Sequence, residues 1–324
     1  MFKKIHPSLL SFLILSGVCI HHAIAQTYPT RPIRLVVPYT PGQGADSAAR
    51  IVATKLSERL LQAIVIDNKP GAAGNIGSEI VARAPSDGYT LLMGSNATHA
   101  ANSSLFKSLR FDPQNDFSAV AYIGSVSMVM LASPSFAATN IEDLLKLAKN
   151  RPGDLTVAVP STTARVALEL LTTNTGAKFK EVPYKGSSAA MTDLMGGHVL
   201  LSIDTAVAAT PLVSNGKLKA LGVTTLNRTA VLPDIKTFSE TGLIGYNIAA
   251  WNVWVAPRGT PKEIIDLLNK EIRTVLNDPD VKSKLIALGY EPDTTMSPNS
   301  VSEFLRNETK KWGELIRSAG IKED

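Results

Sequence analysis

The chain has 324 residues, of which 44% are hydrophobic and 19% charged, and its formal net charge is +5. This composition is typical of a globular protein and excludes collagen-like, coiled-coil and wholly disordered chains. Beyond the N-terminus, the sequence contains no apolar stretch long enough to cross a bilayer, which excludes a multi-span membrane protein. The length allows one large domain or two of ordinary size.

The first 25 residues (1–25) have the three parts of a secretory signal peptide. Lys3 and Lys4 form a basic start, residues 9–20 form an apolar core, and Ala23-Ile24-Ala25 supplies the small residues that precede cleavage. Lipid attachment at Cys19 is the alternative that this segment leaves open. We predict export to a bacterial periplasm, with a mature chain that begins at residue 26.

Removal of the signal changes the chemistry that is available to the mature protein. Two lysines are lost, so the net charge falls to +3, and the one cysteine and three of the five histidines are lost with them. The remaining His99 and His198 are almost 100 residues apart, so we expect no metal site and no cofactor. The chain has no Lys/Arg run with interleaved aromatic residues, so we expect no nucleic acid partner. A mild positive charge suits a small anionic ligand.

The first part of the mature chain alternates strands and helices. Short β-branched runs predict strands at 33–37, 64–66 and 90–93, and apolar residues at helical spacing predict helices at 45–60 and 76–83. This βαβαβ order implies a parallel sheet with helices on its faces.

The middle of the chain repeats this alternation, and the C-terminal part is helical. The predicted strands are 126–131, 155–159, 182–184, 200–203 and 220–223, and the predicted helices are 141–149, 166–171, 264–276, 281–288 and 301–316. The tripeptide Val-Pro-Tyr follows a predicted strand at 37–39 and again at 182–184, which hints at two similar lobes.

Two glycine-rich turns join predicted strands to predicted helices. In the first, 41–46, unpaired N–H groups and the helix dipole can bind a carboxylate or phosphate without a basic side chain. The alternative is a plain turn in which Asp46 caps or pairs with the first helical turn. Its glycines form only an incomplete dinucleotide-binding fingerprint. The second turn, 70–77, either packs against the sheet or offers more N–H donors.

Few residues suggest catalysis. The sequence lacks a Gly-x-Ser-x-Gly motif, so a hydrolase would need His99 within hydrogen-bond distance of a serine such as Ser95. His99 follows a predicted strand, where it could contact a ligand or be a loop histidine without a role. Asp204 also follows a predicted strand. It is either a surface acid in a turn or an acceptor for a ligand hydroxyl, an amine or a bridging water.

Taken in order, these segments resemble the Bug family, the extracytoplasmic solute-binding proteins of tripartite tricarboxylate transporters. The resemblance covers essentially the whole mature chain. The segments that carry it are 28–39 (YPTRPIRLVVPY), 41–46 (PGQGAD), 68–77 (NKPGAAGNIG), 87–92 (DGYTLL), 182–186 (VPYKG), 216–223 (GKLKALGV), 232–234 (LPD), 240–242 (ETG) and 256–261 (APRGTP).

The resemblance implies an α/β fold of the two-lobed, type II-like periplasmic binding protein kind. Each lobe would be a mixed, mostly parallel sheet flanked by helices. Lobe 1 would comprise residues 26–123 and 246–324 and lobe 2 residues 124–245, with hinges near 123–126 and 242–251. Backbone amides, small hydroxyls and ordered waters would hold a ligand carboxylate in the cleft. By position, the ligand contacts are Tyr39, Gly42, Gln43, Gly44, Ala45, Asp46, Asn75, Ser95, Asn96, Ser127, Ser161, Thr162 and Asp204.

Three features depart from the family pattern that the resemblance implies. Gln43 stands where a glycine is usual, so a side chain intrudes beside the anion site. Val159 and Pro160 stiffen a loop that is usually rich in glycine. Arg165 stands where a histidine is common, and it either reaches a second carboxylate or faces the solvent.

The expected function is that of a monomeric periplasmic receptor without enzymatic activity. It would bind a small organic mono- or dicarboxylate and deliver it to the membrane permease subunits of a tripartite tricarboxylate transporter. The alternatives are a ligand sensor that signals to a membrane sensor kinase and a periplasmic hydrolase.

Overall fold

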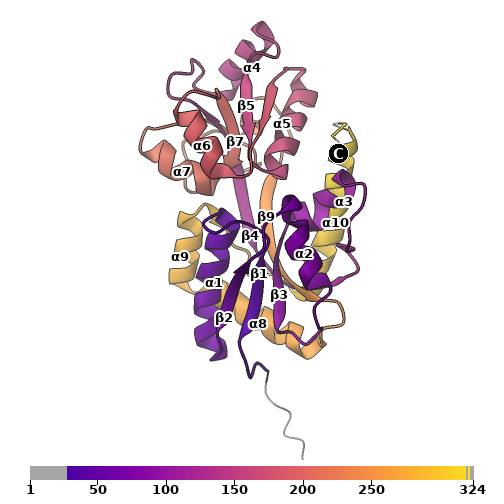
Figure 1. The fold of residues 1–324 in the computed structure, drawn as a ribbon. Helices are drawn as coiled ribbons and strands as arrows, with labels where there is room; N and C mark the ends of the chain where they lie inside the picture. The colour runs from indigo at the N-terminus through magenta and orange to yellow at the C-terminus, as the bar shows by residue number, and fades with distance from the viewer. Residues whose placement is uncertain (1–27, 319, 322–324) are drawn as a thin grey trace, which may run out of the picture.

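The computed structural model describes residues 28–318, 320 and 321. The predicted signal peptide and Cys19 lie outside the described residues. Figure 1 shows two lobes, one above the other, with the chain passing between them more than once. Within the described residues, no helix combines the length and apolar character needed to cross a membrane.

The lower lobe in Figure 1 is a mixed sheet covered by helices on both faces. Its strands, in spatial order, are β2 (Ile64–Asn68), β1 (Ile33–Val37), β3 (Thr90–Ser95), β9 (Ala249–Pro257), β4 (Phe117–Ala132) and β10 (Tyr290–Glu291). One face carries α1 (Gly44–Leu60), α8 (Lys262–Asn277) and α9 (Pro279–Ala287). The other carries η1 (Ala72–Gly74), α2 (Asn75–Ala82), the π-helix η2 (Ala97–Ala101), α3 (Asn102–Leu105) and α10 (Pro298–Ser318).

The upper lobe repeats this architecture with fewer elements. The end of β4 lies between β7 (Leu201–Thr205) and β8 (Lys219–Val223), and β5 (Thr156–Val159) and β6 (Lys180–Pro183) continue the sheet beyond β7. Helices α4 (Ile141–Asn150) and α5 (Thr162–Thr175) cover one face, and α6 (Ser187–Met195) and α7 (Ala206–Ser214) cover the other. A short helix, η3 (Ser239–Thr241), precedes the return to β9.

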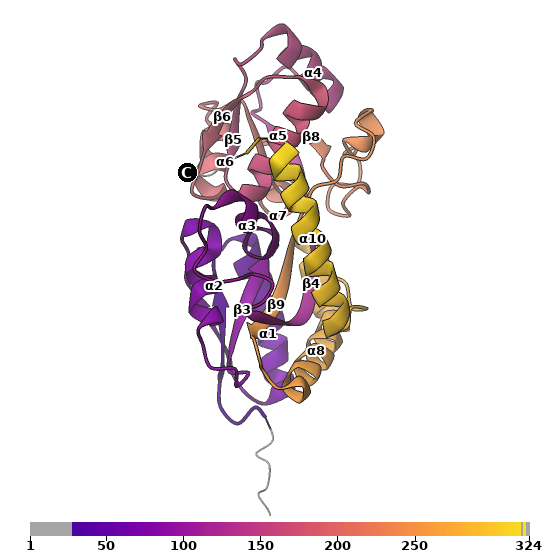
Figure 2. The same ribbon diagram turned by 90° about the vertical axis from the view of Figure 1, so that its right-hand side faces the viewer.

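Strand β4 joins the two lobes. It pairs with β9 as far as Ser127, and from Met128 onward with β7 and β8. Helix α10 runs beside this junction and packs against η2 and β4 as well as against α5 of the upper lobe (Figure 2). The lobe boundaries at residues 123 and 245 stay a prediction. Tyr246, just beyond the second boundary, donates a hydrogen bond to Ala167 O in the upper lobe.

The α/β, two-lobed fold is confirmed, and most of the predicted elements lie within two or three residues of the expected positions. Antiparallel pairing is more extensive than expected, since the described strands form four parallel and five antiparallel pairs. The reason is the crossing strands, because β9 and β4 are antiparallel to each other and to all of the strands that they pair with. Helix 166–171 is longer than expected, and β9, α6, α7 and the first half of β4 were not predicted.

Candidate functional site

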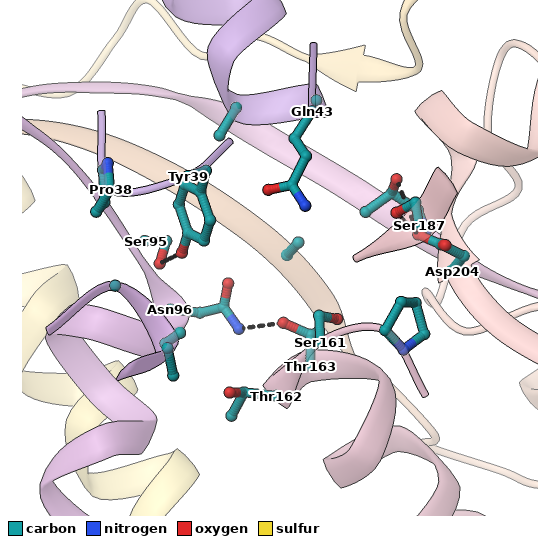
Figure 3. Close-up of a pocket in the computed structure, with 18 of the residues that line it drawn as sticks. Pro38, Tyr39, Gln43, Ser95, Asn96, Ser161, Thr162, Thr163, Ser187 and Asp204 are labelled. Atoms are coloured by element: carbon teal, nitrogen blue, oxygen red, sulfur yellow. Dashed lines mark hydrogen bonds between the residues drawn. The ribbon is translucent and has the colours of Figure 1, made fainter. Parts of the chain in front are cut away.

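A cavity of about 750 Å³ lies between the lobes. Its lower wall comes from the ends of β1 and β3, the start of α1 and the turn before α2. Its upper wall comes from the starts of α5, α6 and α7, and β9 crosses behind it. Figure 3 shows side chains from both lobes directed into this space.

Four helices begin at the cavity wall. Gln43, Ser161, Gly186 and Thr205 are the N-cap residues of α1, α5, α6 and α7. No side chain caps the start of α1, so the N–H groups of its first turn remain available for a ligand. The positive ends of four helix dipoles therefore face one space, which favours an anion without requiring a basic side chain.

Asp46 fixes the turn before α1 rather than facing the cavity. Its side chain is buried and accepts hydrogen bonds from Gly42 N at 2.8 Å, Asn68 Nδ2 at 2.8 Å and Arg50 Nε at 2.9 Å. Burial alone would raise the pKa of this carboxyl, but the hydrogen bonds from Arg50, Gly42 and Asn68 outweigh burial and hold the pKa below its ordinary value. The ionised carboxylate therefore holds the turn that presents the α1 amides.

Gln43 reaches from the lower lobe to the upper one. Its amide points into the cavity in Figure 3, and a Cβ on Gly186 would lie 2.6 Å from Gln43 Nε2. Gly186 has φ 156° and ψ 170°, a conformation that is essentially restricted to glycine. Gln43, for which the resemblance led us to expect a glycine, therefore packs against a glycine of the opposite lobe.

Two further hydrogen bonds organise the cavity. The Tyr39 hydroxyl and Ser95 Oγ lie 2.5 Å apart within the lower lobe. Asn96 Nδ2 donates to Thr163 Oγ1 at 2.7 Å, and this bond joins η2 to α5 across the cleft (Figure 3). Asn96 and Thr163 are both buried, so this bond between the lobes is shielded from solvent.

The glycine-rich turn at 70–77 forms a wall of the cavity. Gly74 has φ 91°, and a Cβ there would lie 2.6 Å from Thr98 Cγ2. We expect Gly74→Ala to lower the free energy of unfolding by about 2–4 kcal/mol, because strain at positive φ adds to the overlap. Gly153→Ala is the matched control, since Gly153 has φ 83° but a Cβ on it would meet no atom within 4 Å. Equal losses in chemical denaturation would contradict a role for the Thr98 contact.

The upper wall carries a buried carboxyl, Asp204. Its Oδ1 accepts hydrogen bonds from Ser187 Oγ at 2.9 Å and from Thr205 N at 2.7 Å. Its Oδ2 is buried and has no hydrogen-bond partner among the described residues. Burial raises the pKa of Asp204 to about 6.

Arg165 lies on the cavity wall beside a carboxylate of the protein itself. Its Nε is 3.4 Å from Glu181 Oε1, and both residues line the cavity. The two opposite charges largely offset each other, so this part of the wall adds little net charge. Whether Arg165 also reaches a ligand carboxylate stays a prediction.

His99 lies in η2, and the expected loop position is wrong. The ring is fully buried, lies tilted against the Phe117 ring and shares a hydrogen bond through Nδ1 with Thr98 Oγ1 at 2.8 Å. Burial lowers the pKa of His99 to about 3, so the ring is neutral at physiological pH. Ser95 Oγ is hydrogen-bonded to Tyr39 instead, so the described residues lack the His99–Ser95 pair that a hydrolase would need. They also contain no group of three or more His, Cys, Asp and Glu residues suited to a metal ion.

Most of the predicted ligand contacts meet at the cavity, and four do not. The residues that line it are Tyr39, Gln43, Gly44, Ala45, Ser95, Asn96, Ser161, Thr162 and Asp204. Gly42 and Asp46 bond to each other behind the α1 turn. Asn75 lines a smaller surface pocket and accepts a hydrogen bond from Asn102, and Ser127 shares a hydrogen bond with Thr225. Whether any of the thirteen contacts a ligand stays a prediction.

Several cavity residues were not predicted, because they belong to elements that the sequence pattern did not reveal. Ser187 lies at the start of α6, and Trp251 and Asn252 lie on β9. Thr163 follows Thr162 in α5, and the serine N-cap at 161 is the signal that marks this helix start.

Comparison with known proteins places this arrangement among solute receptors. The family model described as tripartite tricarboxylate transporter family receptor matches residues 48–321. Rpa4515 of R. palustris, solved with adipate, is 38% identical with a TM-score of 0.87, and the match covers 91% of this chain and 99% of that one. The periplasmic binding protein BugD is 32% identical with a TM-score of 0.84, covering 91% and 100%. MatC from Rhodopseudomonas palustris with bound malate is 30% identical with a TM-score of 0.82, covering 89% and 100%.

Proposed function

The chain belongs to the tripartite tricarboxylate transporter receptor family, and from this membership we propose that it is a periplasmic receptor for a small organic carboxylate. The carboxylate would occupy the cavity between the lobes. Adipate and malate, bound by the similar Rpa4515 and MatC, indicate the size and chemistry of the ligand.

The observation that carries this proposal is the convergence of four helix N-termini on the cavity. The amides of Gly44 and Ala45 supply donors from the lower lobe, and Ser161, Thr162 and Thr163 supply them from the upper lobe. A carboxylate bridging the two sets gains hydrogen bonds from both lobes only when they close. Ligand binding would thereby stabilise the closed form.

The closed form would then be recognised by the permease subunits of a tripartite tricarboxylate transporter. A permease can distinguish the two forms, because closing brings surfaces of the two lobes into a fixed arrangement that the open form lacks. A membrane sensor kinase would recognise the same closure of the lobes. Family membership favours the permease.

The experiment is a thermal-shift screen of the mature protein against organic mono- and dicarboxylates. A ligand that binds only the folded state adds about 2.7 kcal/mol at a concentration of 100 Kd, so a specific carboxylate should raise the unfolding temperature by several degrees. Sugars and inorganic phosphate serve as controls. If no organic acid shifts the transition at millimolar concentration, the proposal is wrong.

A further inference from the structure

Asp204 Oδ2 is a hydrogen-bonding atom on the cavity wall that no described protein group satisfies. Asp204 is 2% exposed, and its other oxygen, Oδ1, takes the donors that Ser187 and Thr205 provide. Buried polar atoms in native proteins nearly always have a partner, and one without a partner beside a binding cavity is explained by an ordered water, an ion or a group of the ligand. A hydrogen-bond donor on the ligand could satisfy Asp204 Oδ2.

Figure 3 shows where this atom lies relative to the anion site. Asp204 and Ser187 are on one side of the cavity, Tyr39 and Ser95 are on the other, and the Gln43 amide projects between them. A ligand whose carboxylate reaches the α1 and α5 amides can therefore place a second functional group against Asp204.

The charges around Asp204 determine which functional group fits. Its opposite residue on β4 is the apolar Val129, and its contact from α6 is the hydroxyl of Ser187. The charged side chains lining the same cavity are Arg165 and Glu181, which pair with each other, and the exposed Lys185. At pH 8, well above its pKa of about 6, Asp204 is ionised and can only accept a hydrogen bond. A second carboxylate would be repelled there, whereas a hydroxyl or ammonium group would be bound.

We propose that the ligand is a carboxylate that also carries a hydroxyl or ammonium group, and that this group donates a hydrogen bond to Asp204 Oδ2. The inference rests on the proposed function of the cavity and narrows its ligand from organic acids in general to those that bear a donor.

The test compares matched probes by calorimetry at pH 8. One set is succinate, malate and aspartate, and a longer set is adipate, 2-hydroxyadipate and 2-aminoadipate. Within a set, the wild-type protein should bind the hydroxyl- or ammonium-bearing acid roughly 10-fold to 100-fold more tightly than the plain diacid. The two donor-bearing acids in each set distinguish a hydroxyl from an ammonium group.

In the Asp204→Asn protein, the preference for the donor-bearing acid over the plain diacid should weaken or reverse. The asparagine carbonyl can accept from Ser187 and Thr205 as Oδ1 does, which leaves the NH₂ group in the place of Oδ2 as a donor. The preference should then shift by at least 10-fold toward the plain diacid. Asp154→Asn is the matched control, because it removes an exposed carboxylate of the same lobe and should leave the preference unchanged.

A plain diacid that binds wild-type protein as tightly as its donor-bearing partners would overturn the inference and leave the proposed function standing. So would an Asp204→Asn protein that folds, binds both kinds of probe and keeps the wild-type preference. If none of the six acids binds and the broader screen is also negative, both the inference and the proposed function are wrong.

Discussion

Replacing Thr163 by valine is expected to weaken ligand binding by roughly 5-fold to 100-fold. The change keeps the shape of the side chain but removes the acceptor for Asn96 Nδ2, a bond of 2.7 Å that joins the lobes. In the open form the Asn96 amide can bond to water, whereas in the closed form it would be buried without a partner. That cost is about 1–3 kcal/mol, and it arises only on closure.

Calorimetry with the carboxylate that gives the largest thermal shift measures this effect. Thr173→Val is the matched control, because Thr173 lies on the same helix, α5, but is exposed. The control should bind as the wild type does. An unchanged dissociation constant for Thr163→Val would show that the Asn96–Thr163 bond does not contribute to closure around the ligand.

Replacing Asp46 by alanine is expected to lower the free energy of unfolding by about 3 kcal/mol. The substitution removes the buried acceptor that Gly42 N, Asn68 Nδ2 and Arg50 Nε share, and each of these hydrogen bonds to a charged group contributes about 1 kcal/mol or more. Ligand affinity should fall as well, because the turn before α1 would lose the carboxylate that fixes it. Urea denaturation and calorimetry measure the two effects.

The contribution of Asp46 should depend on pH with a defined sign. Its pKa is held below the ordinary value in the folded state, so its stabilisation is complete above about pH 4 to 5 and is lost as the pH falls through the folded-state pKa. The difference between wild type and Asp46→Ala should therefore shrink in acid. Asp266→Ala, which removes an exposed carboxylate paired with Lys262 four residues away, should cost less than about 1 kcal/mol. A loss at Asp46 as small as this would contradict the role assigned to it.

The elements that the sequence predicted are those with strong local patterns. The local patterns of the run at 33–37 and of the apolar stripe of α8 predict a strand and a helix without information from the rest of the chain. Helices α6 and α7 consist mostly of small residues, and α7 contains Pro211, so neither shows a stripe of large apolar side chains. Strand β9 carries tryptophans at 251 and 254 and is buried on both faces, which removes the alternation that marks a half-exposed strand.

The sequence predicted the site residues that follow strand ends. It did not predict which side chains hydrogen-bond to one another. Tyr39, Ser95 and Asp204 follow predicted strands, and all three line the cavity. Asp46 lies in the same turn as the cavity-lining Gln43, but its hydrogen bonds with Arg50 and Asn68 turn it away from the cavity. The sequence left both interpretations of Asp46 open, because it does not show which partner the carboxylate selects.

The crystal structure of the protein grown with the carboxylate that gives the largest thermal shift tests the central claim most directly. The account predicts a carboxylate within about 3 Å of the amide nitrogens of Gly44 and Ala45, enclosed between α1 and α5. A ligand bound outside the cleft, or held in it by basic side chains with those amides unoccupied, would contradict the account.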